Sequence, residues 1–152
     1  MSKETGLSAL ILAAGNGKRM KSAKPKVLCE VLFKPMICWV RDWCERAGIS
    51  EVCVVLGPDG DEVKTHFPEG TSFALQQERR GTGHAALQAK AFLRAHAGGD
   101  VLVLGGDAPF VDDETIRGAL GMHRESGCAV TVITAQVDDP AGYGRIVRSK
   151  RS

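Results

Sequence analysis

The amino-acid sequence predicts an α/β fold built on a mostly parallel sheet. Apolar segments of strand length alternate with segments of helical periodicity, and this alternation favours parallel strands joined by right-handed crossovers. Several of the apolar runs are almost uninterrupted, with Val101–Leu104 as the clearest example. Uninterrupted runs are typical of strands that are covered on both faces. A glycine-containing turn follows the first run, at the strand end where such sheets bind ligands.

The expected strands are short apolar segments, and the expected helices are the amphipathic segments between them. The five expected strands are Ser8–Ala14, Glu51–Leu56, Ser72–Gln76, Asp100–Gly105 and Ala129–Gln136. The four expected helices are Pro35–Ala47, Gly60–His66, Thr82–His96 and Asp113–Ser126. Gly48 lies where a C-terminal cap belongs, and Thr82 is expected to be an N-cap. Trp39 and Trp43 are four residues apart on one helix, a spacing that indicates core packing.

The composition limits the classes of protein to which this chain can belong. The 152 residues suit one domain with a substantial core, and 43% hydrophobic with 25% charged residues is ordinary for a soluble globular protein. A net charge of +2 is too weak to indicate nucleic acid as a partner. No stretch approaches the roughly 20 apolar residues of a membrane span, so no membrane partner is expected.

The cysteines point to a reducing compartment. There are five, an odd number, and none forms a C-x-x-C pair. This pattern argues against a disulfide framework and a zinc site, and it fits free thiols in a cytosol. The N-terminal apolar run is short and leads into a glycine–lysine stretch rather than a cleavage site, so a signal peptide is not expected. We expect a cytoplasmic protein.

The stretch Ala9–Leu28 carries the first functional signal. An apolar segment of strand length is followed by Gly15 and Gly17, which let the backbone bend tightly and approach a ligand. Five cations follow, namely Lys18, Arg19, Lys21, Lys24 and Lys26. Exposed backbone N–H groups beside this many cations suit the binding of a polyphosphate. The alternative interpretation is a strand, a turn and a solvated basic loop with no ligand.

Two known phosphate motifs do not match this stretch. The dinucleotide fingerprint needs a third glycine where Met20 stands. The Walker loop needs serine or threonine after Gly17-Lys18, where Arg19 stands. The residues from Leu12 to Met20, LAAGNGKRM, followed by Pro25-Lys26, instead resemble the opening of the sugar-phosphate nucleotidyltransferases.

This resemblance implies a Rossmann-like, three-layer α/β/α fold. It also implies that the first strand and its turn bind a nucleotide, through Leu12, Ala13, Ala14, Gly15 and Gly17. Arg19 and Lys26 are the catalytic residues that it implies. Arg19 would stabilise the leaving pyrophosphate, and Lys26 would bind the α-phosphate or the sugar phosphate.

The third expected strand ends in Gln76, and Gly81-Thr82-Gly83-His84 follows shortly afterwards. An amide side chain beside a glycine–threonine turn offers donors and acceptors for the edge of a base. A plain loop with a helix cap is the alternative interpretation. The segment also resembles the uridylyltransferase branch of the family, which implies that Gln76, Gly81 and Thr82 contact a uracil ring. His84 is expected to order the start of the helix.

The fourth expected strand ends in Gly105-Gly106-Asp107. A carboxylate freed by two glycines at a strand end is well placed to hold a hard cation, and Mg2+ is the natural choice beside a triphosphate. The alternative is an aspartate that caps the following turn. The family resemblance implies that Asp107 is the metal ligand.

Asp138–Ile146, DDPAGYGRI, is the fourth segment that resembles the family, and it implies that Gly144 helps to bind the sugar acceptor. The four segments stand in the family's order between Leu7 and Arg148. Together they are most similar to the pyrophosphorylase domains of bacterial N-acetylglucosamine-1-phosphate uridylyltransferases. The resemblance implies a Mg-dependent reaction of UTP with a sugar 1-phosphate, N-acetylglucosamine 1-phosphate, which releases pyrophosphate and supplies UDP-N-acetylglucosamine for the cell wall.

The family has further acceptor and metal residues after the fourth segment, and Ser152 ends this chain before them. We therefore expect residues 1–152 to form a single nucleotidyltransferase domain that is incomplete at its C-terminus and carries no β-helix acetyltransferase domain. The strand beginning at Gly144 would lack its usual partners. Two other functions stay open, namely a non-catalytic nucleotide-binding module and a nucleotidyltransferase that uses CTP or GTP. The oligomeric state also stays open.

Overall fold

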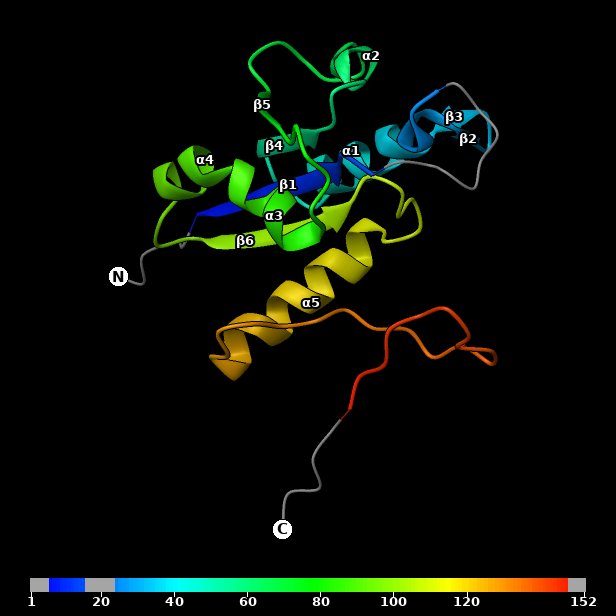
Figure 1. Cartoon of the computed structure of the whole chain (residues 1–152). Coiled ribbons are helices and arrows are strands. Elements are labelled where there is room, and N and C mark those ends of the chain that lie inside the picture. The colour runs from blue at the N-terminus through cyan, green and yellow to red at the C-terminus, as the bar shows by residue number, and fades with distance from the viewer. Residues whose placement is uncertain (1–5, 16–23, 148–152) are drawn as a thin grey trace. The chain divides into compact units, whose positions relative to one another are not determined.

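The computed structural model describes residues 6–15 and 24–147. The chain divides into two compact units, Met1–Gly118 and Ala119–Ser152. The first unit contains a four-stranded sheet with the strand order β5-β4-β1-β6 (Figure 1). Its strands are β1 (Leu7–Ala13), β4 (Glu51–Leu56), β5 (Ser72–Leu75) and β6 (Asp100–Gly105). All neighbouring strands in this sheet are parallel, so the predicted parallel α/β fold is confirmed.

The register brings the carboxyl ends of the four strands to one edge. Ala13 lies opposite Leu56, and Leu12 lies opposite Gly105. Leu56 in turn lies opposite Leu75. The loops that leave the strands at this edge are therefore neighbours in space, although they are far apart in the sequence.

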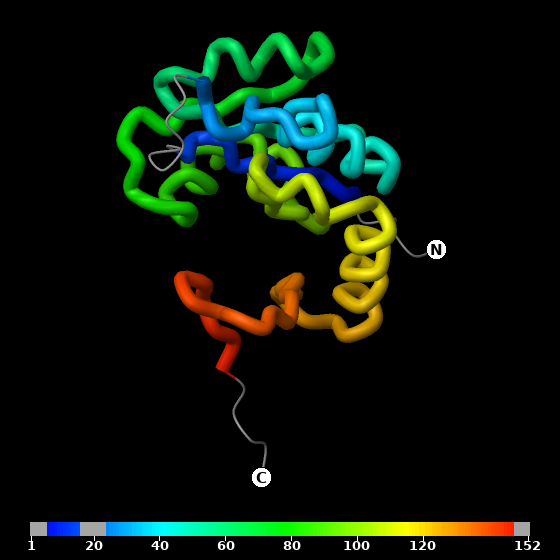
Figure 2. Tube along the Cα trace, turned by 90° about the vertical axis from the view of Figure 1, so that its right-hand side faces the viewer, coloured from blue at the N-terminus to red at the C-terminus, as the bar shows by residue number. Residues whose placement is uncertain are grey.

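Helices cover both faces of the central strands β1 and β4. The covering predicted from Val101–Leu104 is wrong, because β6 lies at the end of the strand order and leaves Val101 38% and Val103 50% exposed. Ala9, Ile11 and Ala13 of β1 belong to a core cluster that includes residues of α1 (Met36–Arg46). Leu10, from the opposite face of the same strand, clusters with Ala85 of the α3–α4 region. Figures 1 and 2 show α1 and the α3–α4 pair on opposite sides of β1. Because successive side chains of a strand point to opposite faces, an uninterrupted apolar run is what this arrangement requires.

The smaller elements complete the first unit and lead into the second. They are η1 (Lys26–Leu28), β2 (Glu30–Val31), β3 (Lys34–Pro35), α2 (Asp61–Lys64), α3 (Thr82–Gln88), α4 (Lys90–Ala95) and α5 (Asp113–Ser126). Gly48 follows α1 with φ +85°, and its N–H donates to the Glu45 carbonyl at 2.9 Å, so the predicted C-terminal cap is confirmed. Within the described ranges, none of the helices is both long enough and apolar enough to cross a bilayer.

The single helix predicted over Thr82–His96 is wrong. Ala89 separates α3 from α4, with φ −85° and ψ 18°, and its N–H donates to the Ala86 carbonyl at 3.1 Å. This is an i→i−3 bond, which tightens the turn and interrupts the α-helix. No glycine or proline marks the break. The prediction of Thr82 as the N-cap is also wrong by one residue, because Gly81 occupies that position and Thr82 is the first helical residue.

The strand predicted over Ala129–Gln136 is also wrong. Residues 127–147 of the second unit contain neither a helix nor a strand, as the orange-to-red trace of Figure 2 shows. Val130 and Val132 are 74% and 62% exposed. A strand forms only with a ladder partner, and the described part of this unit supplies none. The strand expected to begin at Gly144 is irregular for the same reason.

Trp39 and Trp43 stack with their ring centroids 5.7 Å apart. The Trp43 indole packs against the main core, as predicted, and its Nε1–H donates to the Pro109 carbonyl at 2.8 Å. Both tryptophans are half-buried, and the Trp39 Nε1–H donates to the Val31 carbonyl at 2.9 Å. The pair therefore links α1 both to the β2–β3 hairpin and to the loop after β6.

The five cysteines are free thiols, and three of them, Cys38, Cys44 and Cys53, are buried. Burial raises the pKa of the Cys44 thiol to about 12 and that of Cys53 to about 11. Because the thiolate is the nucleophile, we expect both to resist iodoacetamide at about pH 8, whereas the exposed Cys128 is alkylated. Peptide mass spectrometry with and without denaturant measures this. Labelling of native Cys44 as fast as Cys128 would contradict the burial of Cys44.

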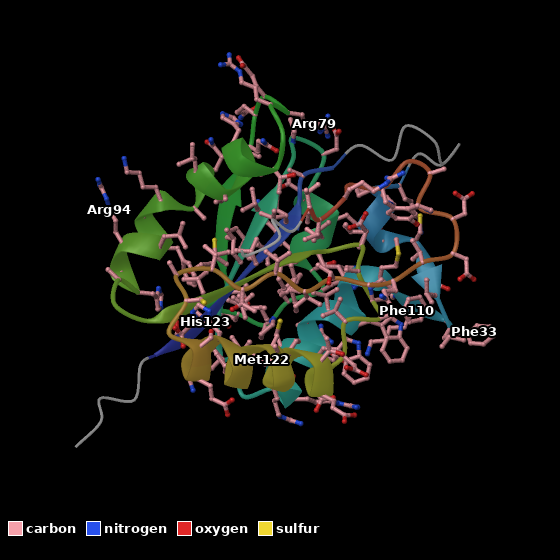
Figure 3. All side chains as sticks on the ribbon, turned by 90° about the horizontal axis from the view of Figure 1, so that it is seen from below. Phe33, Arg79, Arg94, Phe110, Met122 and His123 are labelled. Atoms are coloured by element: carbon pink, nitrogen blue, oxygen red, sulfur yellow. The ribbon has the colours of Figure 1, made fainter. Side chains whose placement is uncertain are left out.

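The β2–β3 hairpin turns through two bulky residues in the left-handed region. Leu32 has φ 51° and Phe33 has φ 62°, and their exposed fractions are 72% and 96%. Figure 3 shows Phe33 at the periphery of the molecule. Two-residue hairpin turns with both φ values positive favour Asn-Gly. The double change Leu32→Asn with Phe33→Gly should therefore raise the free energy of unfolding by about 1–2 kcal/mol, measured by urea denaturation.

A control separates this backbone effect from the loss of an exposed aromatic ring. Phe110 is 78% exposed and does not have a positive φ. Phe110→Ala should change the free energy of unfolding by no more than about 0.5 kcal/mol. An equal gain from both variants would show that the turn conformation contributes nothing.

Candidate functional site

A cavity of about 790 Å³ lies at the carboxyl edge of the sheet. It is lined by Leu12, Ala14, Gly15, Gln76, Gln77, Arg79, Gly81, Thr82, Ala85, Val103, Leu104, Gly105 and Asp107. The lining comes from β1 and its turn, the loop after β5, the start of α3, and the end of β6. This is the place where parallel α/β sheets bind ligands.

Gln76 is the buried polar side chain of this cavity, with 3% of its surface exposed. Its backbone N–H extends the ladder to the Leu56 carbonyl at 2.8 Å. Its side-chain Nε2 donates to the Gly81 carbonyl at 3.2 Å and lies 2.9 Å from His84 Nδ1. These contacts fix the amide, so that nitrogen faces the loop and the oxygen is the atom that can accept from a ligand.

Gly81 gives the loop its shape. Its φ of +99° is a backbone conformation that residues with a side chain rarely adopt. Its carbonyl accepts a hydrogen bond from the Ala85 N–H at 3.0 Å, where α3 begins. His84 holds Gln76 from the first turn of α3, in agreement with the ordering role expected for it. The loop from Gln76 to His84 therefore closes on itself through side-chain and backbone bonds.

Lys26 and Asp107 form an ion pair beside the cavity. Lys26 Nζ lies 2.6 Å from Asp107 Oδ2, and both side chains are 41% exposed. An ion pair this exposed contributes at most about 1 kcal/mol to stability. The ion pair matters for the positions of the two groups, because it brings a cation from η1 and a carboxylate from the turn after β6 to the same edge of the sheet.

Two glycines make room for this aspartate. A Cβ on Gly105 would lie 2.7 Å from Asp107 Oδ1, so a side chain there would force the carboxylate to move. The Gly106 N–H donates to the Leu12 carbonyl at 2.9 Å, which anchors the turn to β1. A Cβ on Gly106 would meet Val27 at 3.1 Å. The turn is therefore held tightly between β1 and η1.

Asp107 fits a magnesium ion that also binds phosphate. Mg2+ prefers oxygen ligands and commonly takes one or two carboxylates, the remaining ligands being water and substrate phosphates. The described residues contain no group of three His, Cys, Asp or Glu side chains that could hold a metal alone. Asp107 supplies one carboxylate beside the cavity, and this donor fits a metal whose remaining ligands are water and phosphate oxygens.

The structure thus brings together most of the predicted site residues. Leu12, Ala14, Gly15, Gln76, Gly81, Thr82 and Asp107 line the cavity. Lys26 joins them through Asp107, whereas the Ala13 side chain lies in the core cluster. Gly17 and Arg19 lie outside the described residues. Gly144 is exposed and belongs to the second unit.

Sequence reasoning missed Arg79. This residue lines the cavity, and its Nε–H donates to the Ala14 carbonyl at 2.8 Å. Arg79 and Arg80 lie between Gln76 and Gly81, and no role is predicted for either of them from the sequence. The available signal was a long cation in a loop at the ligand-binding edge of the sheet.

The family model of the MobA-like NTP transferase domain matches residues 9–150, so the chain belongs to this family of nucleotidyltransferases. The bifunctional protein GlmU of Thermoanaerobacter pseudethanolicus is 46% identical over 145 residues, which are 95% of this chain and 31% of that protein. GlmU of Fervidobacterium nodosum is 48% identical over 142 residues, 93% of this chain and 30% of that protein. The predicted family resemblance is confirmed, and the chain spans about a third of the length of these relatives.

Solved structures support the same fold. Rv0371c from Mycobacterium tuberculosis H37Rv has a TM-score of 0.67 at 23% identity, covering 81% of this chain and 63% of that one. A UDP-glucose pyrophosphorylase complexed with UDP-glucose has a TM-score of 0.66 at 20% identity, covering 81% and 55%. These likenesses confirm the Rossmann-like nucleotidyltransferase fold.

Proposed function

We propose that this chain binds UTP and carries the nucleotide-binding part of an N-acetylglucosamine-1-phosphate uridylyltransferase site. The observation that carries the proposal is the cavity at the sheet edge, where the Gln76–Thr82 loop, the turn at Gly15 and the Lys26–Asp107 pair meet. The relationship to GlmU proteins at 46–48% identity supports the sugar-phosphate class. In this proposal UTP reacts with N-acetylglucosamine 1-phosphate to give UDP-N-acetylglucosamine and pyrophosphate.

The Gln76 amide supports uracil over cytosine. Its Nε2 is engaged by Gly81 and His84, so its oxygen is the atom to offer to a base. Uracil carries an N–H at ring position 3, where cytosine carries an acceptor, so an amide oxygen pairs with uracil and opposes cytosine. Guanine also presents a ring N–H, and a purine needs more room than a pyrimidine. A nucleotide panel therefore has to include both CTP and GTP.

The chemistry proposed here is an in-line displacement at phosphorus. A phosphate oxygen of the sugar phosphate forms a bond to the α-phosphorus of UTP, and the bond to the bridging oxygen of the β-phosphate breaks. The electron pair leaves with pyrophosphate. Lys26 and Arg19 would neutralise charge on the phosphates, and Gly15 would offer its backbone N–H. Gly144 would contact the sugar.

Asp107 would hold the magnesium ion against the phosphates. The bound ion supplies positive charge that offsets the charge on the reacting phosphate oxygens. The ion pair between Lys26 and Asp107 holds the carboxylate and the lysine at the same edge of the sheet, so that both would reach the same phosphates. Binding of magnesium and triphosphate would then exchange one ion pair for two charge-assisted contacts.

The test is pyrophosphate release from UTP by the 152-residue chain with N-acetylglucosamine 1-phosphate and MgCl2. The expected result is release that requires both the sugar phosphate and the metal, and that is lost with EDTA. Parallel reactions with CTP and GTP measure base preference. Faster release with CTP than with UTP would overturn the assignment of Gln76.

A second function, nucleotide binding without turnover, is favoured by the composition of the cavity. Its described lining includes the residues predicted to bind the nucleotide, namely Leu12, Ala14, Gly15, Gln76, Gly81 and Thr82, together with Asp107. Isothermal titration calorimetry with UTP and Mg2+ beside the activity assay separates the two functions. Binding without release supports the module, and no binding of any nucleotide contradicts both.

A further inference from the structure

Arg79 links two sides of the cavity that the proposed function assigns to different parts of the nucleotide. It lies in the loop between Gln76 and Gly81, which forms one side. Its Nε–H donates to the Ala14 carbonyl at 2.8 Å, at the end of β1, which leads into the other side. Figure 3 shows Arg79 near the point where β1 leads into its turn.

The guanidinium also reaches the loop after β4. Arg79 Nη2 lies 3.2 Å from Asp59 Oδ2, and the side chains are 33% and 78% exposed. This exposed ion pair adds little by itself. The pair lies on a second edge of the guanidinium, whereas the Nε–H bond to Ala14 is the contact that reaches the end of β1.

Gly57 leaves the space that the guanidinium occupies. A Cβ built on Gly57 would lie 2.9 Å from Arg79 Nη2 and 3.3 Å from the Ala14 carbonyl oxygen. A side chain at position 57 would therefore press on both partners of the Arg79–Ala14 bond. The glycine, the carbonyl and the guanidinium fit one another as a set.

The Ala14 carbonyl belongs to the peptide group that contains the Gly15 N–H. Because a peptide group is planar, holding the carbonyl oxygen also sets the direction of that N–H. Gly15 has no Cβ to restrict its backbone, and a Cβ there would meet nothing within 4 Å. An external contact is therefore needed to hold this peptide in one orientation.

We propose that Arg79 is a positioning residue that fixes the Ala14–Gly15 peptide, against the loop that carries Gln76, before the nucleotide binds. It acts through the Ala14 carbonyl. This inference rests on the proposed binding of UTP at this cavity. Its effect is preorganisation, since a backbone already held in the bound orientation loses less conformational freedom when the ligand arrives.

Calorimetric titration of the whole chain with UTP and Mg2+ tests the inference. Arg79→Ala should weaken UTP binding about tenfold, as expected for the loss of one hydrogen bond from a charged donor. Gly57→Ala should also weaken UTP binding, because its Cβ would disturb the Arg79–Ala14 bond although the arginine is still present. Arg79→Lys should recover part of the affinity, because a lysine can still donate to the Ala14 carbonyl.

Two matched controls keep the positioning contact. Arg80→Ala removes the neighbouring cation, which pairs with Glu78 and is 70% exposed. Asp59→Asn removes the partner charge and leaves the Arg79–Ala14 bond. Both should bind UTP within about twofold of wild type. Thermal unfolding of each variant, compared with wild type, distinguishes a loss of affinity from a loss of folded protein.

Three results would overturn the inference. The first is unchanged UTP affinity in folded Arg79→Ala. The second is full affinity in Gly57→Ala beside weak binding in Arg79→Ala, which would mean that Arg79 contacts the nucleotide directly. The third is unchanged hydrogen exchange in folded Arg79→Ala without nucleotide. The inference predicts faster exchange in a peptide that contains Ala14 and Gly15. The exchange measurement needs no nucleotide, so it tests the positioning role even if wild type does not bind UTP. Failure of wild type to bind UTP would refute only the proposed function.

Discussion

Replacing Asp107 with asparagine is expected to lower magnesium-dependent pyrophosphate release from UTP by about 100-fold or more. Asparagine has nearly the same shape, so the tight turn formed with Gly105 and Gly106 can persist. The change removes the negative charge that would hold a cation against the phosphates, and it also removes the salt-bridge partner of Lys26. Release is measured at several MgCl2 concentrations, because a weakened metal site should need more metal.

Asp112→Asn is the matched control. Asp112 also follows β6, but its Oδ1 accepts from the Thr115 N–H at 2.9 Å at the start of α5. Asparagine can cap a helix as well as aspartate does, so this variant makes the same chemical change while the cap is kept. Its activity should equal that of wild type. Equal activity in Asp107→Asn as well would remove Asp107 from the proposed metal site.

Replacing Gly99 with alanine is expected to lower the free energy of unfolding by about 2–3 kcal/mol. Gly99 precedes β6, and a Cβ there would lie 2.3 Å from the carbonyl oxygen of Gly6. That oxygen accepts from the Asp100 N–H at 2.8 Å, next to the point where β1 and β6 begin to pair. Because the clash is with backbone, it is relieved only by moving one central strand against its neighbour. Urea denaturation followed by circular dichroism measures the loss.

Gly121→Ala provides the opposite control. Gly121 lies within α5, and a Cβ there would meet nothing within 4 Å. Alanine inside a helix is favoured over glycine by up to about 1 kcal/mol, so this variant should be slightly more stable than wild type. Two glycine-to-alanine changes of opposite sign would show that the position decides the outcome. A Gly99→Ala variant as stable as wild type would contradict the close approach of β1 and β6.

The local patterns predicted the sheet and the ligand-binding edge well. The four strands of the sheet lie within a residue of their expected ends. The apolar runs of β1 and β4 are buried on both faces, as predicted, whereas β5 and β6 lie at the two ends of the strand order and keep exposed side chains. Once the strands are parallel, their carboxyl ends share one edge. This is why Gln76 and Asp107, which are 31 positions apart in the printed sequence, line the same cavity. Their meeting was implied by topology alone.

The errors have a common origin in contacts that a short window of sequence does not contain. Ala129–Gln136 has the composition of a strand, but a strand needs a partner to complete its backbone hydrogen bonds. The break at Ala89 is made by one i→i−3 bond and no breaking residue. The cap at Gly81 depends on a φ of +99°, which the glycine permits and the loop imposes.

The sequence by itself determined the parallel α/β class and the edge at which the ligand-binding loops gather. It could do so because burial of apolar strands and the freedom of glycine are properties of short segments. Only the tertiary structure decided the pairing of Lys26 with Asp107, the orientation of the Gln76 amide and the contact of Arg79 with Ala14. These depend on distances between loops that are remote in the sequence, and such distances exist only after the sheet has set its register.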